Sequence, residues 1–543
     1  MSAGHHGNGE RVGIGDHAFL SDCRTAALVA PDGGVDWMCV PRFDGPSIFS
    51  RCLDRERGGS WRWWIEDAER TESHYTGASL ILRSQWETPG GQALTHDLLA
   101  VFGEDDHLYG KGFLLRTVEC LSGEVVVHGV VDAAPDHARQ RANWNRTREG
   151  GLSAEPGLHL HGTPEPTPHP DGTARFHAEL RAGETAVLAL GYAGTRAPST
   201  VEDAHGWLET SRNSWENWAQ RSGYDGIGAE HVHRGALVLR GLLHTDSGGL
   251  IAAPTTSLPE WPGGPRNWDY RYVWHRDAPL VVLALMRLGH VEDAGSYLRA
   301  LLDSCRPRTE RIPPARTLDS GPLPTETVLE HLDGYAGSRP VRAGNAADVQ
   351  HQLDVYGHIL DAALSYEQVT GDLGEEEVRE LALIVGMAQR HWRAPDEGIW
   401  EVREDPRHWT ISKVCAWVCF DRAVQLAELT GLEDLPVEEW RVERDAVHEE
   451  VLRLGFNEEI GAFTQSYGSR NVDGSLLRIP LLGFLDCQDT RVLGTIERIS
   501  VELGEGPDLI HRYDPEATGD AEMGPEGAFL MCSFDMVSAL ALA

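Results

Sequence analysis

Apolar and polar residues alternate along the first part of the chain. Every second position is apolar in 125–131 and again in 176–180, and a second apolar run follows at 186–190. A period of two places one set of side chains on one face of a strand. Turn-forming residues separate such runs at 31–34, 89–91 and 170–172. The pattern predicts many short strands, which is typical of an antiparallel β-sandwich, and we assign it to residues 1–200.

The period changes after this region. Residues 201–227 carry Trp207, Trp215 and Trp218 at helical spacing, and we expect a helical linker there. From 228 to 543 apolar residues recur every three or four positions, as in the stripe that begins at Val378. The stretch 280–288 is apolar nearly all round, which predicts a helix buried on every side. Strands followed by helices, without alternation, indicate two domains.

The charge narrows the kinds of partner. The chain of 543 residues has a formal net charge of −36 at pH 7. Nucleic acid and anionic membranes are therefore excluded as partners, because repulsion replaces the counterion release that drives such binding. A neutral ligand is indifferent to this charge, and an acidic surface also keeps a protein soluble. Association of identical subunits is compatible with the sequence.

Cysteine usage and the absence of targeting signals predict a cytoplasmic protein. The nine cysteines are dispersed, without paired spacings, which fits reduced thiols better than a disulfide framework. Residues 1–9 are polar, and no run of about 18 apolar residues occurs. His159 and His161 are spaced to share a strand face, but no further ligand lies near them, so we expect no metal and no cofactor.

Three polar, aromatic segments interrupt the helical pattern. The segment 266–277 sets indole rings beside arginines and aspartates, which suits a sugar ring and its hydroxyls, although a helix start with a buried ion pair is an alternative. In 396–403, Glu401 directly follows Trp400. In 524–529, Glu526 lies at a helix start, where a glutamate also serves as ordinary dipole compensation. Apolar rings disfavour the charged form of a carboxyl, which makes Glu401 a candidate general acid, and Glu526 is a second candidate catalytic residue.

An ordered series of short motifs runs nearly from end to end. They lie at 22–29, 36–37, 41–44, 252–260, 266–271, 334–346, 352–357 and 465–468, and in the loop around Glu526. In this order they resemble glycoside hydrolase family 15, the group of glucoamylases, glucodextranases and trehalases, in its bacterial two-domain form.

The resemblance implies a fold and a set of site residues. The fold would be an N-terminal antiparallel β-sandwich followed by an all-α (α/α)6 barrel over 228–543. Glu401 would be the general acid and Glu526 the general base. The residues expected to bind the substrate are Arg276, Asp277, Trp268, Trp400, Arg339 and Arg342.

The implied activity is an inverting, exo-acting hydrolysis of a small α-glucoside of the trehalose, maltodextrin or isomaltose type, with β-glucose released from the non-reducing end. Two alternatives remain open. Disaccharide phosphorylases share the architecture but use phosphate as the nucleophile, so they need no carboxylate base. A relative that binds sugars without cleaving them is the other alternative.

Four features depart from the family pattern. His275 stands beside the pair at 276–277, where relatives more often carry an apolar residue, and Val402 follows the expected acid where fungal glucoamylases have a second carboxyl. The Pro-rich segment 312–332 differs from the usual loop that helps to shape the leaving-group side. The chain stops inside an apolar helix at 529–543, which predicts an exposed core face or a different closure of the barrel.

Overall fold

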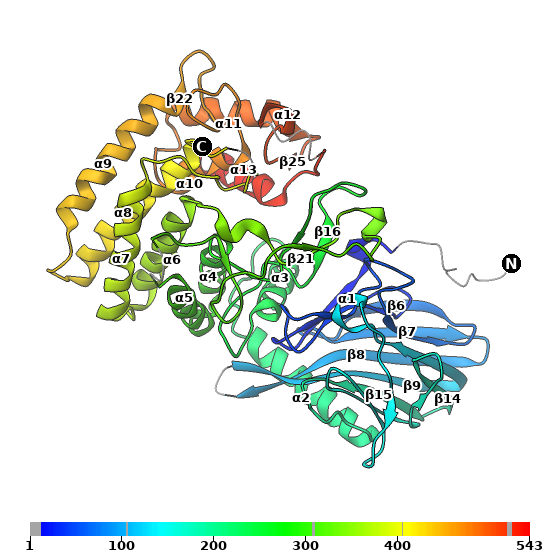
Figure 1. Cartoon of the computed structure of the whole chain (residues 1–543). Coiled ribbons are helices and arrows are strands. Elements are labelled where there is room, and N and C mark those ends of the chain that lie inside the picture. Colours follow the sequence, from blue (N-terminus) through cyan, green and yellow to red (C-terminus); the bar gives the residue numbers. More distant parts are fainter. Residues whose placement is uncertain (1–11, 105–106, 307–309, 404, 519–523) are drawn as a thin grey trace.

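The structure is a computed structural model that describes residues 12–104, 107–306, 310–403, 405–518 and 524–543. A sheet-rich N-terminal domain is followed by a helical domain (Figure 1). The two domains confirm the change of period that the sequence predicts after residue 200. The polar stretch 1–9 lies outside the described residues.

The N-terminal domain contains a 15-stranded sheet in which the paired strands run antiparallel. Its strands are β1 (Ala18–Ser21), β2 (Ala26–Val29), β3 (Val35–Cys39), β4 (Ser47–Phe49), β5 (Ser60–Ile65), β6 (Glu69–Tyr75), β7 (Leu82–Thr88), β8 (Gly91–Glu104), β9 (His107–Asp132), β10 (Asn145–Arg146), β11 (Leu152–Ala154), β12 (Leu158–Thr163), β13 (Thr167–Pro168), β14 (Ala174–Arg181) and β15 (Thr185–Gly191). A short helix, α1 (Pro135–Ala138), follows β9.

The long strand β9 holds the two halves of this sheet together. Its first part pairs with β8 and β15, and its second part pairs with β5 and β14. Along β14 the odd and even residues alternate strictly between exposed and buried, as the period of two predicts. Side chains from both halves, Trp61 and Leu152 among them, meet in one buried cluster. The two halves of the sheet therefore share one buried core.

A helix joins the two domains. In α2 (Val201–Ala219), the Thr200 side chain accepts a hydrogen bond from the backbone amide of Asp203 and so caps the first turn. The helix packs against β8, β9 and β15. Trp215 and Trp218 are buried in the core of the helical domain, and the Trp218 indole donates to the Asp293 carboxylate at 2.6 Å. The tryptophan spacing therefore reflects contact with both domains.

Consecutive helices of the second domain pack in pairs, and alternate helices also contact one another, as in α4 with α6 and α6 with α8. The helices are α3 (Ala229–Leu242), α4 (Asp277–Leu288), α5 (Val291–Cys305), α6 (Asp354–Thr370), α7 (Glu375–His391), α8 (Thr410–Thr430), α9 (Val437–Leu454), α10 (Arg478–Leu481), α11 (Thr490–Glu502), α12 (Pro515–Thr518) and α13 (Leu530–Leu542). Short two-stranded ribbons connect them, formed by β16 (Thr256–Pro259) with β17 (Asn267–Asp269), β18 (Val273–Trp274) with β19 (Ala315–Arg316), β20 (Thr327–Val328) with β21 (Arg342–Ala343), β22 (Phe456–Asn457) with β23 (Ala462–Phe463), and β24 (Gly504–Glu505) with β25 (Leu509–Ile510).

The helical stripes are confirmed except in one place. Val378, Leu381 and Val385 are buried in α7, as their spacing predicts. The expectation that 280–288 is buried on every side is wrong, because Leu280 and Val281 line a cavity. An apolar helix surface therefore faces the candidate site instead of a protein core.

Three further observations concern the described part of the chain. All nine cysteines are free thiols, and most are buried. No helix among the described residues is both long and apolar enough to cross a membrane. On α13, Phe534, Val537 and Leu540 are exposed, so one face of this apolar helix is uncovered in the structure.

Candidate active site

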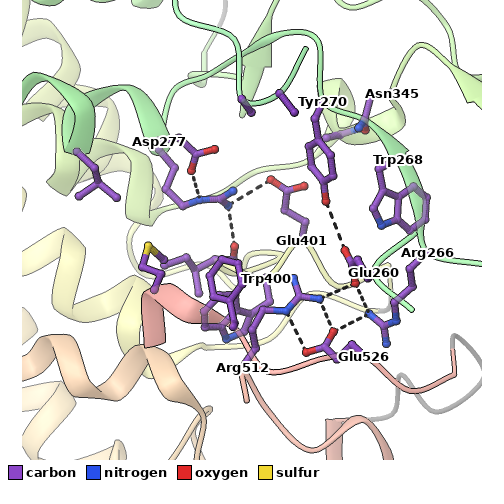
Figure 2. Close-up of a pocket in the computed structure, with 18 of the residues that line it drawn as sticks. Glu260, Arg266, Trp268, Tyr270, Asp277, Asn345, Trp400, Glu401, Arg512 and Glu526 are labelled. Atoms are coloured by element: carbon purple, nitrogen blue, oxygen red, sulfur yellow. Dashed lines mark hydrogen bonds and ion pairs between the residues drawn. The ribbon is translucent and has the colours of Figure 1, made fainter. Parts of the chain in front are cut away.

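A cavity of about 640 Å³ brings the three polar segments of the sequence together. It is lined by six of the eight predicted site residues, namely Glu401, Glu526, Arg276, Asp277, Trp268 and Trp400. The two glutamates project into the same space from loops far apart in the sequence (Figure 2). The helices and ribbons thus bring to one cavity the candidate groups that the sequence identifies one at a time.

Glu401 lies in the loop between α7 and α8 and has a left-handed backbone with φ of +57°. A non-glycine residue rarely adopts this conformation, and such strain is typical of functional sites. Its Oε1 accepts hydrogen bonds from the Trp274 indole at 2.7 Å and from Arg276 Nη1 at 3.2 Å. Both contacts are made to Oε1. They fix the orientation of the carboxyl group, and Oε2 takes part in neither of them.

The Asp396 side chain anchors the loop that carries Glu401. The buried Asp396 Oδ2 accepts hydrogen bonds from the amides of Leu353 and Gly398 at 3.1 and 3.2 Å and from Ser412 Oγ at 2.8 Å. Burial raises the pKa of Asp396 to about 7, against the opposing effects of the Leu353 amide and the nearby Lys413 ammonium. This side chain therefore ties the loop to the starts of α6 and α8.

Arg276 and Asp277 lie at the start of α4. Arg276 Nε donates to Asp277 Oδ1 at 3.1 Å, while Nη1 also donates to the backbone oxygen of Ile399 at 2.7 Å. Burial opposes the charge of Arg276, but Asp277 and Glu401 outweigh it and raise the pKa of the guanidinium. The Asp277 side chain is 40 % exposed, so its carboxylate is available to hydroxyl groups in the cavity.

Glu526 is held by two arginines that the sequence analysis missed. Arg512 Nε donates to Glu526 Oε1 at 3.0 Å, and Arg512 Nη2 donates to Oε2. Arg266 Nη1 lies 3.5 Å from the same Oε2. The contacts with both arginines therefore fix the orientation of the Glu526 carboxylate, and only 3 % of its side chain is exposed.

Glu260 and Tyr270 were also missed and line the cavity. Glu260 Oε2 accepts a hydrogen bond from Arg512 Nη2 at 2.9 Å, and the Tyr270 hydroxyl donates to Glu260 Oε1 at 3.4 Å. Both residues lie in segments whose motifs the sequence analysis recognised, 252–260 and 266–271. The motif positions alone carried no signal that distinguished these side chains from structural ones.

Trp268 is the centre of a stacked arrangement at the edge of the cavity. The guanidinium groups of Arg342 and Arg403 lie 4.3 and 4.0 Å from its ring centre. Glu326 pairs with both arginines, at 3.1 Å to Arg342 and 2.8 Å to Arg403. Arg342 does not line the cavity itself, so the expectation that it binds the substrate directly is replaced by a supporting position behind Trp268.

Arg339 lies apart from the site. Its guanidinium is half-exposed and pairs with Asp333, and it is absent from the cavity lining. The structure therefore does not bring Arg339 to the cavity that the other predicted residues line. Arginines three residues apart in an extended segment leave the chain in different directions, so the motif alone did not indicate which of them approaches the cavity.

Trp400 is fixed beside the cavity by a hydrogen bond from its indole to Asp473 at 3.1 Å. Its ring also contacts Phe529 edge-on, with the ring centres 5.9 Å apart. The indole plane is therefore immobilised next to Glu401, as a stacking surface for a sugar requires.

The departures from the family pattern have structural explanations. His275 is buried and bonded to the Pro313 oxygen at 2.7 Å and to Ser304 Oγ at 2.8 Å, away from the cavity, and burial lowers its pKa to about 4. Val402 lines the cavity. Residues 312–332 do not line it, but Glu326 of this segment pairs with Arg403, which does.

Segment 312–332 also connects the domains. Leu329 and Leu332 pack in a buried cluster with Trp37 and Leu53 of the N-terminal domain. Among the described residues, no group of three or more histidine, cysteine, aspartate and glutamate side chains is arranged to hold a metal ion.

Comparisons with known proteins agree with this arrangement. Residues 226–543 match the family described as Glycosyl hydrolases family 15, and residues 6–170 match the description Trehalase-like, N-terminal. The chain is similar over 95 % of its length to a solved bacterial glucoamylase complexed with acarbose, with a TM-score of 0.66 and 13 % identity, covering 83 % of that chain. This likeness concerns the fold, a sheet-rich domain followed by a helical one.

Characterised relatives extend over nearly the whole chain. A trehalase of Mycobacterium tuberculosis is 36 % identical over 97 % of this chain and 81 % of its own length. A trehalase of Thermoplasma acidophilum is 33 % identical over 95 % of this chain and 88 % of its own length. The chain belongs to glycosyl hydrolase family 15 and is a glycoside hydrolase.

Proposed function

We propose that this protein is an inverting, exo-acting α-glucoside hydrolase that releases β-glucose, with Glu401 as general acid and Glu526 as general base. The observation that carries the proposal is that both carboxyl groups line one cavity whose walls bear the aromatic and charged groups that bind sugars. Six matched relatives are named trehalases, which favours trehalose as the substrate over maltodextrins and isomaltose.

The reaction is a single displacement. Glu401 gives its proton to the glycosidic oxygen as the bond from that oxygen to C1 breaks. A water molecule attacks C1 from the opposite face, and Glu526 takes the proton that the water loses. Inversion at an α-linked C1 gives β-glucose, so trehalose yields one β-glucose and one α-glucose. We expect the carboxyl groups to be roughly 6.5–9.5 Å apart, which leaves room for the water.

The contacts of each glutamate agree with its proposed role. Both hydrogen bonds to Glu401 end on Oε1, so Oε2 carries the proton in our mechanism. Arg512 and Arg266 hold the Glu526 carboxylate in a fixed orientation, as a positioned base requires. Asp277 and Arg276 would bind the hydroxyls of the glucose that is released, and Trp268 and Trp400 would stack on sugar rings.

The proposal includes the finer architecture. We infer an (α/α)6 barrel because alternate helices such as α4, α6 and α8 contact one another while each packs against its successor in sequence. We also propose domain limits of 1–200 for the sheet domain, 201–227 for the linker and 228–543 for the catalytic domain. The matched ranges 6–170 and 226–543 support these limits.

A panel of trehalose, maltose, isomaltose, kojibiose and maltotetraose, with glucose release measured, tests the substrate. Proton NMR during the first turnovers tests the mechanism. We expect trehalose to be cleaved fastest and to give equal amounts of β- and α-glucose before mutarotation. Only α-glucose among the first products would mean a double displacement with a carboxylate nucleophile, and would overturn the assignment of roles.

A further inference from the structure

A second carboxylate shares the arginine that holds Glu526. Arg512 Nη2 donates to Oε2 of both Glu260 and Glu526. Arg266 Nη1 lies 3.5 Å from the Glu526 carboxylate and 3.9 Å from that of Glu260. Two guanidinium groups therefore face two carboxylates at one end of the cavity (Figure 2). In the ionised state the four charges cancel.

Glu260 is also linked, through Tyr270 and Trp274, to the part of the site that holds Glu401. The Tyr270 hydroxyl donates to its Oε1, and the Tyr270 ring lies 5.5 Å from the ring of Trp274, whose indole bonds to Glu401. The Glu260 side chain is 21 % exposed, whereas that of Glu526 is 3 % exposed. Of the two carboxylates on Arg512, Glu260 is thus the more open to the cavity.

The charges around Glu260 come from two parts of the chain. Arg512 and Glu526 belong to the C-terminal loops, and Arg266 and Tyr270 belong to the segment around β17. Burial raises the pKa of Glu260, the two arginines oppose that effect, and Glu526 adds to it. The charge of each carboxylate therefore affects the other, because both pair with the Arg512 guanidinium group.

This arrangement has a consequence for a base. A carboxylate paired with two guanidinium groups and nothing else would be so strongly stabilised in its charged form that it would accept a proton from water poorly. A neighbouring negative charge on the same arginine reduces that stabilisation. It also holds Arg512 Nη2 in place when the base becomes neutral during the reaction.

We propose that Glu260 is a positioning residue of the reaction, which offsets the charge of Arg512 and Arg266 so that Glu526 remains both oriented and basic. The proposal rests on the proposed function in taking Glu526 as the base. It assigns to the 252–260 motif a part in the chemistry in addition to its part in the fold.

The first test is Glu260→Gln, which keeps an acceptor for Arg512 but removes the charge. We expect the maximum of kcat/KM for trehalose and for α-glucosyl fluoride to fall about tenfold or more, which equals about 1.4 kcal/mol. The acidic limb of the pH profile should move to lower pH by about one unit. Glu260→Asp, which retains the charge, should keep the wild-type limb even if its rate is lower.

A matched control is Glu443→Gln, because Glu443 is likewise a partly buried carboxylate paired with an arginine, Arg393 at 2.9 Å, but does not line the cavity. It should leave both rate and limb unchanged. An acidic limb that stays in place in Glu260→Gln, or that moves equally in the control, overturns the proposal. If Glu260→Gln does not fold, Glu260→Ala takes its place.

A second measurement does not depend on turnover. In a double-mutant cycle on the free energy of unfolding, Glu260→Gln and Glu526→Gln should be non-additive, because each removes a partner of the same arginine. Additive effects overturn the shared contact, whatever the substrate is. Failure of the proposed function looks different, since the wild type would then cleave no α-glucoside or Glu526→Gln would remain active.

Discussion

Arg276 Nη1 lies 3.2 Å from Oε1 of Glu401, the oxygen that also accepts the Trp274 indole hydrogen. A residue expected to grip the sugar thus contacts the expected acid directly. In the proposed mechanism, the same guanidinium would therefore both bind the glucose and orient the carboxyl group that gives up the proton.

The first prediction concerns Asp277→Ala. The substitution removes a charged acceptor from the cavity wall and leaves sugar hydroxyls without a partner, at a cost of roughly 1.5–3 kcal/mol per lost contact. We expect kcat/KM for trehalose to fall about tenfold to more than a hundredfold. Thermal unfolding should change little, since partly exposed ion pairs contribute about 0–1 kcal/mol. Wild-type turnover in this variant would mean that Asp277 only supports Arg276.

The second prediction separates acid from base. Glu401→Gln should abolish hydrolysis of trehalose, whose leaving group needs a proton, but should spare much of the activity on α-glucosyl fluoride, whose leaving group does not. Fluoride release measured beside glucose release checks this. Equal loss on both substrates would contradict the role of Glu401 as the acid.

Glu526→Gln serves as the complementary variant. Neither substrate reacts without an activated water, so we expect both rates to fall by about 10²–10⁴-fold. The amide also disturbs Arg512, and a melting curve close to that of the wild type is needed to attribute the loss to chemistry. Retained cleavage of the fluoride would exclude Glu526 as the base.

The third prediction compares two arginines of one motif. Arg342 supports Trp268 from 4.3 Å, whereas Arg339 pairs with Asp333 away from the cavity. Arg342→Ala should raise KM for trehalose several-fold, because the indole loses a cation–π partner worth roughly 1–2 kcal/mol when buried. Arg339→Ala should remain within about twofold of the wild type, as surface substitutions usually do. Steady-state kinetics of both variants decide the matter, and the reverse ranking would contradict the placement.

The fourth prediction is a pH dependence of stability. The pKa of Asp396 is raised to about 7 in the fold, against about 3.9 in an unfolded chain. Between these values the native state keeps a proton that the unfolded state has lost, so stability falls as pH rises from about 4 to 7 and is level above. Relative to Asp396→Asn, which does not ionise, the wild type should lose a few kcal/mol over this range.

Urea unfolding of both proteins at several pH values measures that difference. Asp445→Asn is a suitable control, because Asp445 is an exposed partner of Arg444 on α9 and should show no such dependence. A constant difference between the wild type and Asp396→Asn from pH 4 to 8 would contradict a neutral Asp396. Glucose release measured across the same pH range also shows whether the protonation of Asp396 affects the loop that carries Glu401.

Much of the fold could be predicted from the order of residues. The alternation in β14 and the stripe in α7 appear because each element buries one face, and burial leaves a local period. The apolar stretch in α4 was misread, because a helix surface that faces a cavity has the same composition as one that faces a core. An apolar helix surface indicates that the surface is turned away from bulk water. It does not indicate whether packed side chains or a cavity lie against that surface.

For the site, the sequence by itself indicated the two glutamates, the pair Arg276–Asp277 and the two tryptophans as candidates, through their local segments and the family motifs that these resemble, and all six line one cavity. Only the tertiary structure decided which charges meet. Arg512 pairs with Glu526 and also with Glu260, which lies 252 positions before it, and Arg342 contacts Trp268 whereas Arg339 does not line the cavity. Local periodicity records burial, whereas hydrogen bonds between loops depend on where distant helices and ribbons set their ends, and no local pattern carries that information.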